Sequence, residues 1–224
     1  MPDATPALDR IVALVPVRGL EGAKARLGEA LDAEERRALV ERLLRRTIAA
    51  AADTPGVVAV AVVSPDPEVL ALAASARAQG VPQGGGGLNE GLDEGRAWAE
   101  ESGAGAVLVI PGDLPAVSAA ELGRVTAGAR ALAASQAGVD AVERALVALV
   151  PDRAGTGTNL LLLAPPRVIA FRFGEGSRAA HEAAARAAGA LYLELGGALA
   201  FDLDTPDDLL AAEAAGLGAL RAER

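Results

Sequence analysis

Apolar runs that do not alternate with polar residues recur along this chain, and they constrain its fold more than any other feature. The first covers residues 11–15, and similar runs cover 57–63 and 106–110. A run without period-two alternation is typical of a strand buried on both faces, as in a parallel sheet. Between these runs apolar residues recur with helical spacing, which predicts helices over residues 33–52, 67–79, 88–102 and 118–134. The alternation predicts a doubly wound α/β sheet with right-handed connections.

The pattern becomes less regular after residue 150. No repeat and no linker divides the chain, so we expect one domain over residues 1–224 with a mixed sheet. The remaining elements are predicted as strands at 146–150, 160–163 and 192–195, the last at an edge, and as helices over 177–189 and from Thr205 onward.

The composition excludes several classes of function. Acidic residues outnumber basic ones by 30 to 21, and a net charge of −9 argues against a nucleic-acid surface. The chain has no cysteine and one histidine, His181, which excludes disulfides, thiolate chemistry and sites with two imidazoles. No apolar run approaches the roughly 20 residues of a membrane span, and residues 1–4 lack the features of a signal peptide. We therefore expect a cytoplasmic protein without nucleic-acid or membrane partners.

The loop after the first predicted strand carries three cations. Arg18, Lys24 and Arg26 lie between a buried strand and a helix, where backbone N–H groups and cationic side chains can hold a polyphosphate. Only Gly19 and Gly22 occur there, so the loop matches neither the dinucleotide-binding fingerprint nor the common phosphate loop. The alternative is an exposed basic loop without function.

Carboxylates occupy two other loops. Asp113 follows the strand at 106–110, and its alternatives to cation binding are a turn or a helix cap. Asp202 and Asp204 are two residues apart in an extended segment, so both can point the same way and share a metal. The alternative is that Asp204 or Thr205 only caps the following helix. Carboxylates without a His or Cys set favour Mg²⁺, or Mn²⁺, over zinc.

Two further loops are rich in glycine and hydroxyl groups. They cover residues 155–159 and 173–177, and the second leads into a helix N-terminus that favours an anion such as phosphate. For each loop alone the alternative is a turn followed by a Ser N-cap. Together the cationic loop, the carboxylates and this anion site suggest transfer of a nucleotidyl group from a nucleoside triphosphate to a phosphorylated acceptor.

An ordered set of motifs over nearly the whole chain resembles one family, the 2-phospho-L-lactate or phosphoenolpyruvate guanylyltransferases of coenzyme F-420 biosynthesis. The resemblance implies their nucleotide-diphospho-sugar-transferase-like, Rossmann-like fold, related to molybdenum-cofactor guanylyltransferases. The motifs are Val15-Pro16-Val17-Arg18, Ala23-Lys24-Ala25-Arg26-Leu27, Leu88-Asn89-Glu90-Gly91-Leu92, Gly112-Asp113-Leu114-Pro115, Pro151-Asp152-Arg153, Gly155-Thr156-Gly157-Thr158-Asn159, Phe173-Gly174 with Ser177, His181, and Asp202-Leu203-Asp204-Thr205-Pro206.

The resemblance implies a role for each part of the site. GTP and a phosphorylated three-carbon acid are the implied substrates, bound by residues of about 1–150 and about 151–224, respectively. Two positions depart from the family pattern: Arg18 stands where Lys is expected, and Ala25 where Ser is expected. We expect His181 on the helix surface rather than in contact with the acceptor. The implied assignments are Lys24 and Arg26 on the triphosphate, Asn89 near the guanosine, Asp113, Asp202 and Asp204 on Mg²⁺, and Thr158, Gly174 and Ser177 on the acceptor.

Several alternatives stay open. Phosphoenolpyruvate is favoured as the acceptor because the Ala/Arg-rich composition looks bacterial and bacterial members of the family are expected to use this acid. The alternatives 2-phospho-L-lactate and 3-phospho-D-glycerate differ from it only in small groups. A molybdenum-cofactor or sugar-1-phosphate nucleotidyltransferase is the second choice, and a non-catalytic nucleotide-binding module belongs to a different class. A dinucleotide reductase is disfavoured by the missing glycine fingerprint. The sequence is compatible with a homodimer and leaves the oligomeric state open.

Overall fold

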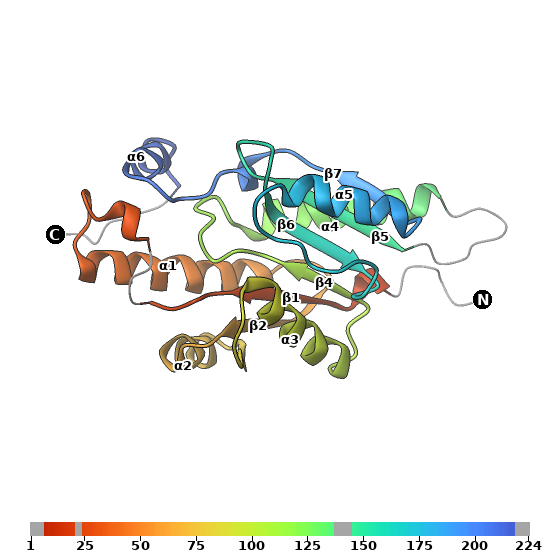
Figure 1. Cartoon of the computed structure of the whole chain (residues 1–224), viewed down its shortest axis with the longest axis horizontal. Helices are drawn as coiled ribbons and strands as arrows, with labels where there is room; N and C mark the ends of the chain where they lie inside the picture. Colours follow the sequence, from red (N-terminus) through yellow and green to blue (C-terminus); the bar gives the residue numbers. More distant parts are fainter. Residues whose placement is uncertain (1–6, 21–23, 137–144, 218–224) are drawn as a thin grey trace.

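The computed structural model describes residues 7–20, 24–136 and 145–217 (Figure 1). Residues 1–4, Gly22 and Ala23, on which expectations above depend, lie outside these ranges. Seven strands form one sheet with the order β3-β2-β1-β4-β6-β5-β7. The strands are β1 (Ile11–Pro16), β2 (Val57–Ser64), β3 (Gln79–Pro82), β4 (Ala106–Val109), β5 (Leu146–Pro151), β6 (Thr158–Ala164) and β7 (Leu191–Glu194).

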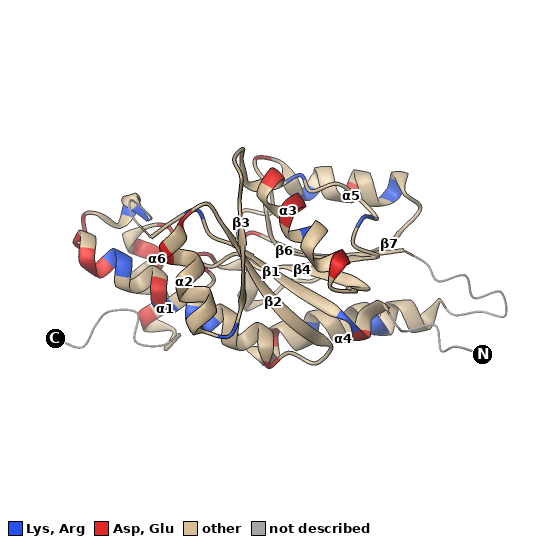
Figure 2. Ribbon diagram, turned by 90° about the horizontal axis from the view of Figure 1, so that it is seen from below, with Lys and Arg blue, Asp and Glu red and all other residues tan. Residues whose placement is uncertain are grey.

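Helices cover both faces of this sheet. Figure 2 shows α3 and α5 on one side of the strands and α1 and α4 on the other. The α-helices are α1 (Ala33–Ala52), α2 (Pro67–Ser75), α3 (Leu88–Glu101), α4 (Ala119–Ser135), α5 (Ser177–Ala187) and α6 (Pro206–Ala214). Three short 3-10 helices are η1 (Ala7–Asp9), η2 (Ala25–Leu27) and η3 (Ala198–Ala200).

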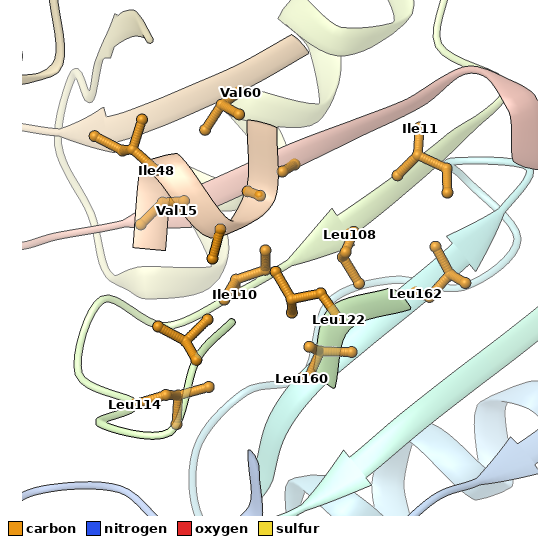
Figure 3. Close-up of a cluster of buried hydrophobic side chains, with 14 of the residues drawn as sticks. Ile11, Val15, Ile48, Val60, Leu108, Ile110, Leu114, Leu122, Leu160 and Leu162 are labelled. Atoms are coloured by element: carbon orange, nitrogen blue, oxygen red, sulfur yellow. The ribbon is translucent and has the colours of Figure 1, made fainter. Parts of the chain in front are cut away.

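The two-sided cover explains why the strand sequences do not alternate. Along β1, Ile11, Ala13 and Val15 face the core under α1 and α4. Val12 and Leu14 face the other core, under α3 and α5. All five residues are fully buried, so both faces need apolar side chains. Figure 3 shows the first of these cores, in which side chains of β1, β4 and β6 meet those of α1 and α4.

The sheet is mixed, as expected. β1 pairs in parallel with β2 and with β4, whereas β6 runs antiparallel to β4 and to β5. β7 pairs in parallel with β5 and forms one edge, as predicted for the strand near residue 192. The chain leaves β1 toward β2 on one side and has β4 on its other side, so a topological switch point lies between β1 and β4. In open α/β sheets a ligand crevice forms at the carboxyl ends of the strands at such a point.

One element was predicted wrongly. The helix expected over residues 67–79 ends at Ser75, and the next residues form the edge strand β3. The helix ends because Arg77 adopts a left-handed conformation with φ +63° and the Ala78 N–H bonds back to the Ala73 carbonyl. Helices usually end this way at glycine, so an arginine in that position gives no stop signal in the sequence.

A third apolar cluster lies beyond the end of the sheet and anchors the C-terminal helix. Leu27 of η2 and Leu39 of α1 pack there with Leu203 and Leu209 around α6. This packing brings η2 and the segment before α6 together, although they are far apart in the sequence. None of the helices in the described ranges combines the length and the apolar character that a membrane crossing needs.

Candidate active site

Lys24 lies at the centre of the site and joins three loops. Its Nζ donates to Asp113 Oδ2 at 2.7 Å and to Asp204 Oδ1 at 2.7 Å. Asp113 follows β4, and Asp204 precedes α6. The Lys24 side chain is 11% exposed, while those of Asp113 and Asp204 are 32% and 42% exposed. The structure therefore brings together three of the residues predicted for the site.

The backbone around Lys24 is itself unusual. Lys24 precedes η2 in a left-handed conformation, with φ +55°. For a residue with a Cβ this conformation costs roughly 1–2 kcal/mol. It is maintained because Leu27, three residues on, is fully buried in the cluster around α6 while the ammonium is held by two carboxylates. Backbone strain of this kind concentrates at functional sites.

The neighbouring carboxylates determine the direction in which the pKa of the Lys24 ammonium shifts. Burial by itself lowers the pKa of Lys24, but the charge of Asp113 and the hydrogen bonds to Asp113 and Asp204 outweigh burial, and the pKa is raised. The pKa of Asp202 is also raised, mainly by burial, with the charges of Asp113 and Asp204 adding to the effect. Lys24 is therefore protonated at neutral pH and is held by the carboxylates of Asp113 and Asp204.

Arg26 and Arg18 lie at the margin of the site. Arg26 Nη1 is 4.0 Å from Asp204 Oδ2, and its side chain is 79% exposed. Arg18 is exposed and lines the cleft described below. Both cations are thus free to turn toward a bound anion, which Lys24 is not without breaking two hydrogen bonds.

The segment that carries Asp202 and Asp204 lies between η3 and α6 and has no regular secondary structure. Leu203 between them is fully buried, so the two carboxylates point away from the core. The Leu203 N–H donates to the Asp113 carbonyl at 3.2 Å, which fixes this segment beside the loop after β4.

A capping residue follows, and it is Thr205 rather than Asp204. Its hydroxyl accepts the Asp208 N–H at 3.2 Å, and Pro206 occupies the first helical position. Asp208 is 4% exposed and accepts from the Thr205 N–H and from Arg153. The capping work is therefore done without Asp204, whose carboxylate is left for Lys24.

The carboxylates do not form a closed metal cage. Within the described ranges no three His, Asp or Glu side chains are arranged to hold a metal ion. Asp113 and Asp204 instead form ion pairs with the ammonium of Lys24.

A cleft of about 230 Å³ opens beside Lys24. Its polar side chains are those of Arg18, Lys24 and Asp113, while the rest of the lining is mostly apolar. Sequence reasoning missed this apolar wall, because residues such as Val40, Leu43 and Val109 have the spacing of ordinary helix or strand core. Leu88, which is 46% exposed at the start of α3, stands out only in the structure. The apolar wall includes Pro16, Val17, Val40, Leu43, Leu88, Leu92, Val109 and Phe173.

Asn89 connects the cleft to the glycine loop at residue 174. Its Nδ2 donates to the Phe173 carbonyl at 3.0 Å, and its Oδ1 accepts the Phe173 N–H at 2.8 Å. Phe173 lines the cleft and directly precedes Gly174. Contact between Asn89 and a guanosine stays a prediction. The Asn89 amide holds the backbone of Phe173, directly before Gly174.

The structure corrects the expectation for His181. It is fully buried, because the inward face of α5 consists of Ser177, His181 and Ala185 at four-residue spacing. His181 Nδ1 is 3.1 Å from Thr158 Oγ1, and His181 Nε2 accepts the Arg172 N–H at 3.0 Å. Burial, and to a smaller extent the charge of Arg172, lowers the pKa of His181 to about 4.

Ser177 is not the N-cap of α5. That position belongs to Gly176, whose φ of +68° suits glycine, and Ser177 is the first helical residue. Ser177 is 1% exposed, and no hydrogen bond ties its side chain to another described residue. Ser177 begins α5 and Thr158 begins β6, and the Arg178 N–H donates to the Thr156 carbonyl, which holds these two element ends together.

The loop before β6 is fastened to the same helix. Asp152 Oδ1 accepts the Thr156 N–H at 2.9 Å, which closes the turn. Arg178 donates from Nη1 to the Gly155 carbonyl at 3.0 Å and forms an ion pair with Glu194 of β7. The two small-residue loops predicted to form one anion site are thus held next to each other.

Comparison with solved structures identifies the fold. The chain resembles a putative nucleotide-diphospho-sugar transferase from Desulfovibrio desulfuricans G20, with a TM-score of 0.69 and 17% identity over 93% of this chain and 87% of that one. It also resembles a nucleotidyl transferase from Methanothermobacter, with a TM-score of 0.59 and 18% identity over 92% of this chain and 97% of that one. The fold is that of the nucleotidyltransferases.

The sequence identifies the family. A family model described as "Guanylyl transferase CofC like" matches residues 11–219. The chain belongs to the CofC-like guanylyl transferases. A phosphoenolpyruvate guanylyltransferase from Rubrobacter xylanophilus is 43% identical over 92% of this chain and 95% of its own. A protein of the same name from Sphaerobacter thermophilus is 43% identical over 88% of this chain and 90% of its own.

Proposed function

We propose that this enzyme transfers GMP from GTP to phosphoenolpyruvate and releases pyrophosphate, giving enolpyruvyl-diphospho-guanosine for coenzyme F-420 biosynthesis in the cytoplasm. The proposal depends above all on Lys24, a largely buried cation that lines the cleft and is held between Asp113 and Asp204. The relatives from Rubrobacter and Sphaerobacter support the choice of nucleotide and acceptor through their names.

The reaction requires charge neutralisation more than proton transfer. An oxygen of the acceptor's phosphate attacks the α-phosphorus of GTP, that P–O bond forms, and the bond from the α-phosphorus to pyrophosphate breaks. The attacking oxygen is already anionic near neutral pH, so no strong general base is needed. The residues must instead align two polyanions and offset their charge. We assign this role on the triphosphate to Lys24 and Arg26.

The carboxylates fit a divalent cation. Mg²⁺ is commonly bound by carboxylates together with substrate phosphates, so open carboxylates at the edge of a cleft suit it without a closed protein cage. We propose that Asp113, Asp202 and Asp204 hold Mg²⁺, or Mn²⁺, once the nucleotide draws Lys24 onto its phosphates. When bound, this ion neutralises phosphate charge and polarises the α-phosphate. Asp113 and Asp204 thus serve Lys24 in the free enzyme and a metal with substrate.

The acceptor is assigned to the loops around α5. Thr158, Gly174 and Ser177 surround the helix N-terminus, where the helix dipole and free N–H groups favour a phosphate or carboxylate. Ser177 is 1% exposed and its hydroxyl has no hydrogen bond to a described residue, so it is available to an acceptor, which supports this assignment. In this scheme residues 1–150 bind mainly GTP and residues 151–224 mainly the acid, with Phe173 between the two.

A pyrophosphate-release assay tests the proposal. Purified enzyme is incubated with GTP and Mg²⁺ and, in separate reactions, phosphoenolpyruvate, 2-phospho-L-lactate or 3-phospho-D-glycerate. We expect the highest kcat/KM with phosphoenolpyruvate, and none without an acid. A higher kcat/KM with another acid reassigns the acceptor. Absence of pyrophosphate release with all three acids refutes the proposed guanylyltransferase reaction. CTP and ATP in place of GTP serve as controls for the base.

A further inference from the structure

Both ring nitrogens of the buried His181 have a partner, and together the partners determine its tautomer. Nε2 lies 3.0 Å from the backbone nitrogen of Arg172, and because a backbone N–H can only donate, Nε2 must accept. A neutral imidazole carries one proton, so this proton is on Nδ1. Nδ1–H therefore donates to Thr158 Oγ1, 3.1 Å away.

The neutral form is the one that prevails at neutral pH. Burial first, and the positive charge of Arg172 second, lower the pKa of His181 to about 4. The remaining ring neighbour is Phe173, which packs edge-on at 5.2 Å between ring centroids and brings no charge. At neutral pH His181 therefore donates from Nδ1 to Thr158 and accepts at Nε2 from Arg172.

This pattern determines where the hydroxyl proton of Thr158 can point. Thr158 Oγ1 uses a lone pair to accept from His181, so its own hydrogen must be directed elsewhere. In residues 7–20, 24–136 and 145–217 the hydroxyl has no other hydrogen-bond partner. Ser177 lies one turn before His181 on the same buried face of α5. Helical side chains lean toward the N-terminus, so His181 reaches toward the end of α5 that carries Ser177.

We propose that His181 is a positioning residue that orients the Thr158 hydroxyl as a donor to the anionic acceptor at the N-terminus of α5. This inference depends on the proposed function, because it concerns the acceptor of that reaction. His181 contacts no substrate in this scheme and acts through Thr158.

The same imidazole also holds the segment that leads to Gly174. By accepting the Arg172 N–H it holds the backbone two residues before Gly174. Asn89 holds the next residue, Phe173, by both its N–H and its carbonyl. A single buried ring therefore joins the Thr158 strand, the Gly174 loop and α5.

Two substitutions separate these functions of the ring. His181→Asn keeps an amide nitrogen near the position of Nδ1 and can still donate to Thr158. His181→Gln reaches the position of Nε2 and can still accept from Arg172, but loses the donor to Thr158. We expect His181→Gln to raise the KM for phosphoenolpyruvate by about tenfold with the KM for GTP unchanged. We expect His181→Asn, which loses only the bond to the Arg172 N–H, to stay within about threefold of the parent protein, because Asn89 still holds the neighbouring Phe173 backbone.

Thr158→Val supplies the decisive comparison. If His181 acts through the Thr158 hydroxyl, His181→Gln has no further effect on the acceptor KM once that hydroxyl is removed. Ala185→Gly is the matched control, since it weakens α5 from the same buried face without touching a polar contact. We expect this control to lower the melting temperature and to leave the acceptor KM unchanged. Assays are run well below the lowest melting temperature.

A spectroscopic measurement tests the orientation without turnover. His181 is the only histidine in the chain, so ¹⁵N-histidine labelling yields the imidazole signals of a single residue. We expect Nδ1 protonated and Nε2 unprotonated at pH 7. Protonation at Nε2 alone, or at both nitrogens, overturns the proposal.

The kinetic outcomes distinguish two failures. Two results refute only the role of His181, provided that the parent protein turns over. One is an unchanged acceptor KM in His181→Gln, and the other is that the effects of His181→Gln and Thr158→Val multiply. Absence of turnover by the parent protein with all three acids refutes the proposed function and this inference with it.

Discussion

Replacing Lys24 by methionine tests the centre of the site. The substitution keeps most of the aliphatic chain and removes the ammonium that donates at 2.7 Å to both Asp113 and Asp204. Hydrogen bonds to charged groups contribute about 1.5–3 kcal/mol each when well buried. Here the carboxylates are 32% and 42% exposed, so water recovers part of that energy. We expect a net destabilisation of about 1–2 kcal/mol.

The size of the chain converts this energy into a melting temperature. For a domain of 150–250 residues, 1 kcal/mol shifts the melting temperature by roughly 2–4 °C, so Lys24→Met should melt about 2–8 °C lower. The loss should shrink when Mg²⁺ is added, because the two unpaired carboxylates then gain another cation. The parent protein, in which Lys24 occupies them, should gain less from Mg²⁺.

Activity should respond more strongly than stability. Without its ammonium the site loses a cation assigned to the triphosphate, and we expect kcat/KM for GTP to fall at least about tenfold, or about 1.4 kcal/mol. Arg26→Met is the matched control for stability, since Arg26 is 79% exposed and only 4.0 Å from Asp204. Its melting temperature should change by less than about 2 °C.

The assays are thermal melts with and without Mg²⁺ and steady-state pyrophosphate release. A Lys24→Met protein that melts like the parent and keeps kcat/KM for GTP within twofold contradicts the reasoning. Both the electrostatic centre and the nucleotide assignment of Lys24 would then be wrong.

Three further outcomes are expected. Ser177→Asp should raise the KM for the acid while leaving the KM for GTP unchanged, and Ser177→Ala should keep its melting temperature because Gly176 is the cap; an unchanged acid KM in Ser177→Asp removes this loop from the acceptor site. Asp204→Asn should lower turnover by at least about a hundredfold, whereas Asp207→Asn, at an exposed neighbouring carboxylate, should not; equal effects would point to general destabilisation. The pKa of His181 falls to about 4 on folding, so its contribution to stability is complete above pH 6.5 and is lost as the pH falls toward 4. Between pH 7 and about pH 4.5 the stability advantage of the parent over His181→Asn should shrink by roughly 2–3 kcal/mol in urea unfolding, and an advantage independent of pH would contradict the lowered pKa.

The sequence alone predicted the elements whose signal is local. A strand covered on both faces needs apolar residues at every position, so residues 11–15 could be recognised as a buried strand without knowing its neighbours. Thr205 followed by Pro206 marked the start of α6 for the same reason, because a cap and its helix are adjacent in the chain. The functional loops could also be placed at strand ends, since that placement follows from the doubly wound pattern.

Other features depend on contacts between distant residues, and only the tertiary structure decided them. Lys24 lies 89 residues from Asp113 and 180 from Asp204, so no local pattern could show that one ammonium joins both carboxylates. His181 borders a stripe of charged residues on a helix otherwise rich in alanine, which made the surface the natural expectation. It is buried because Thr158 and the Arg172 backbone satisfy both of its ring nitrogens, and these partners come from other elements. A polar side chain can leave water only where such partners meet it, and the fold alone determines where they meet.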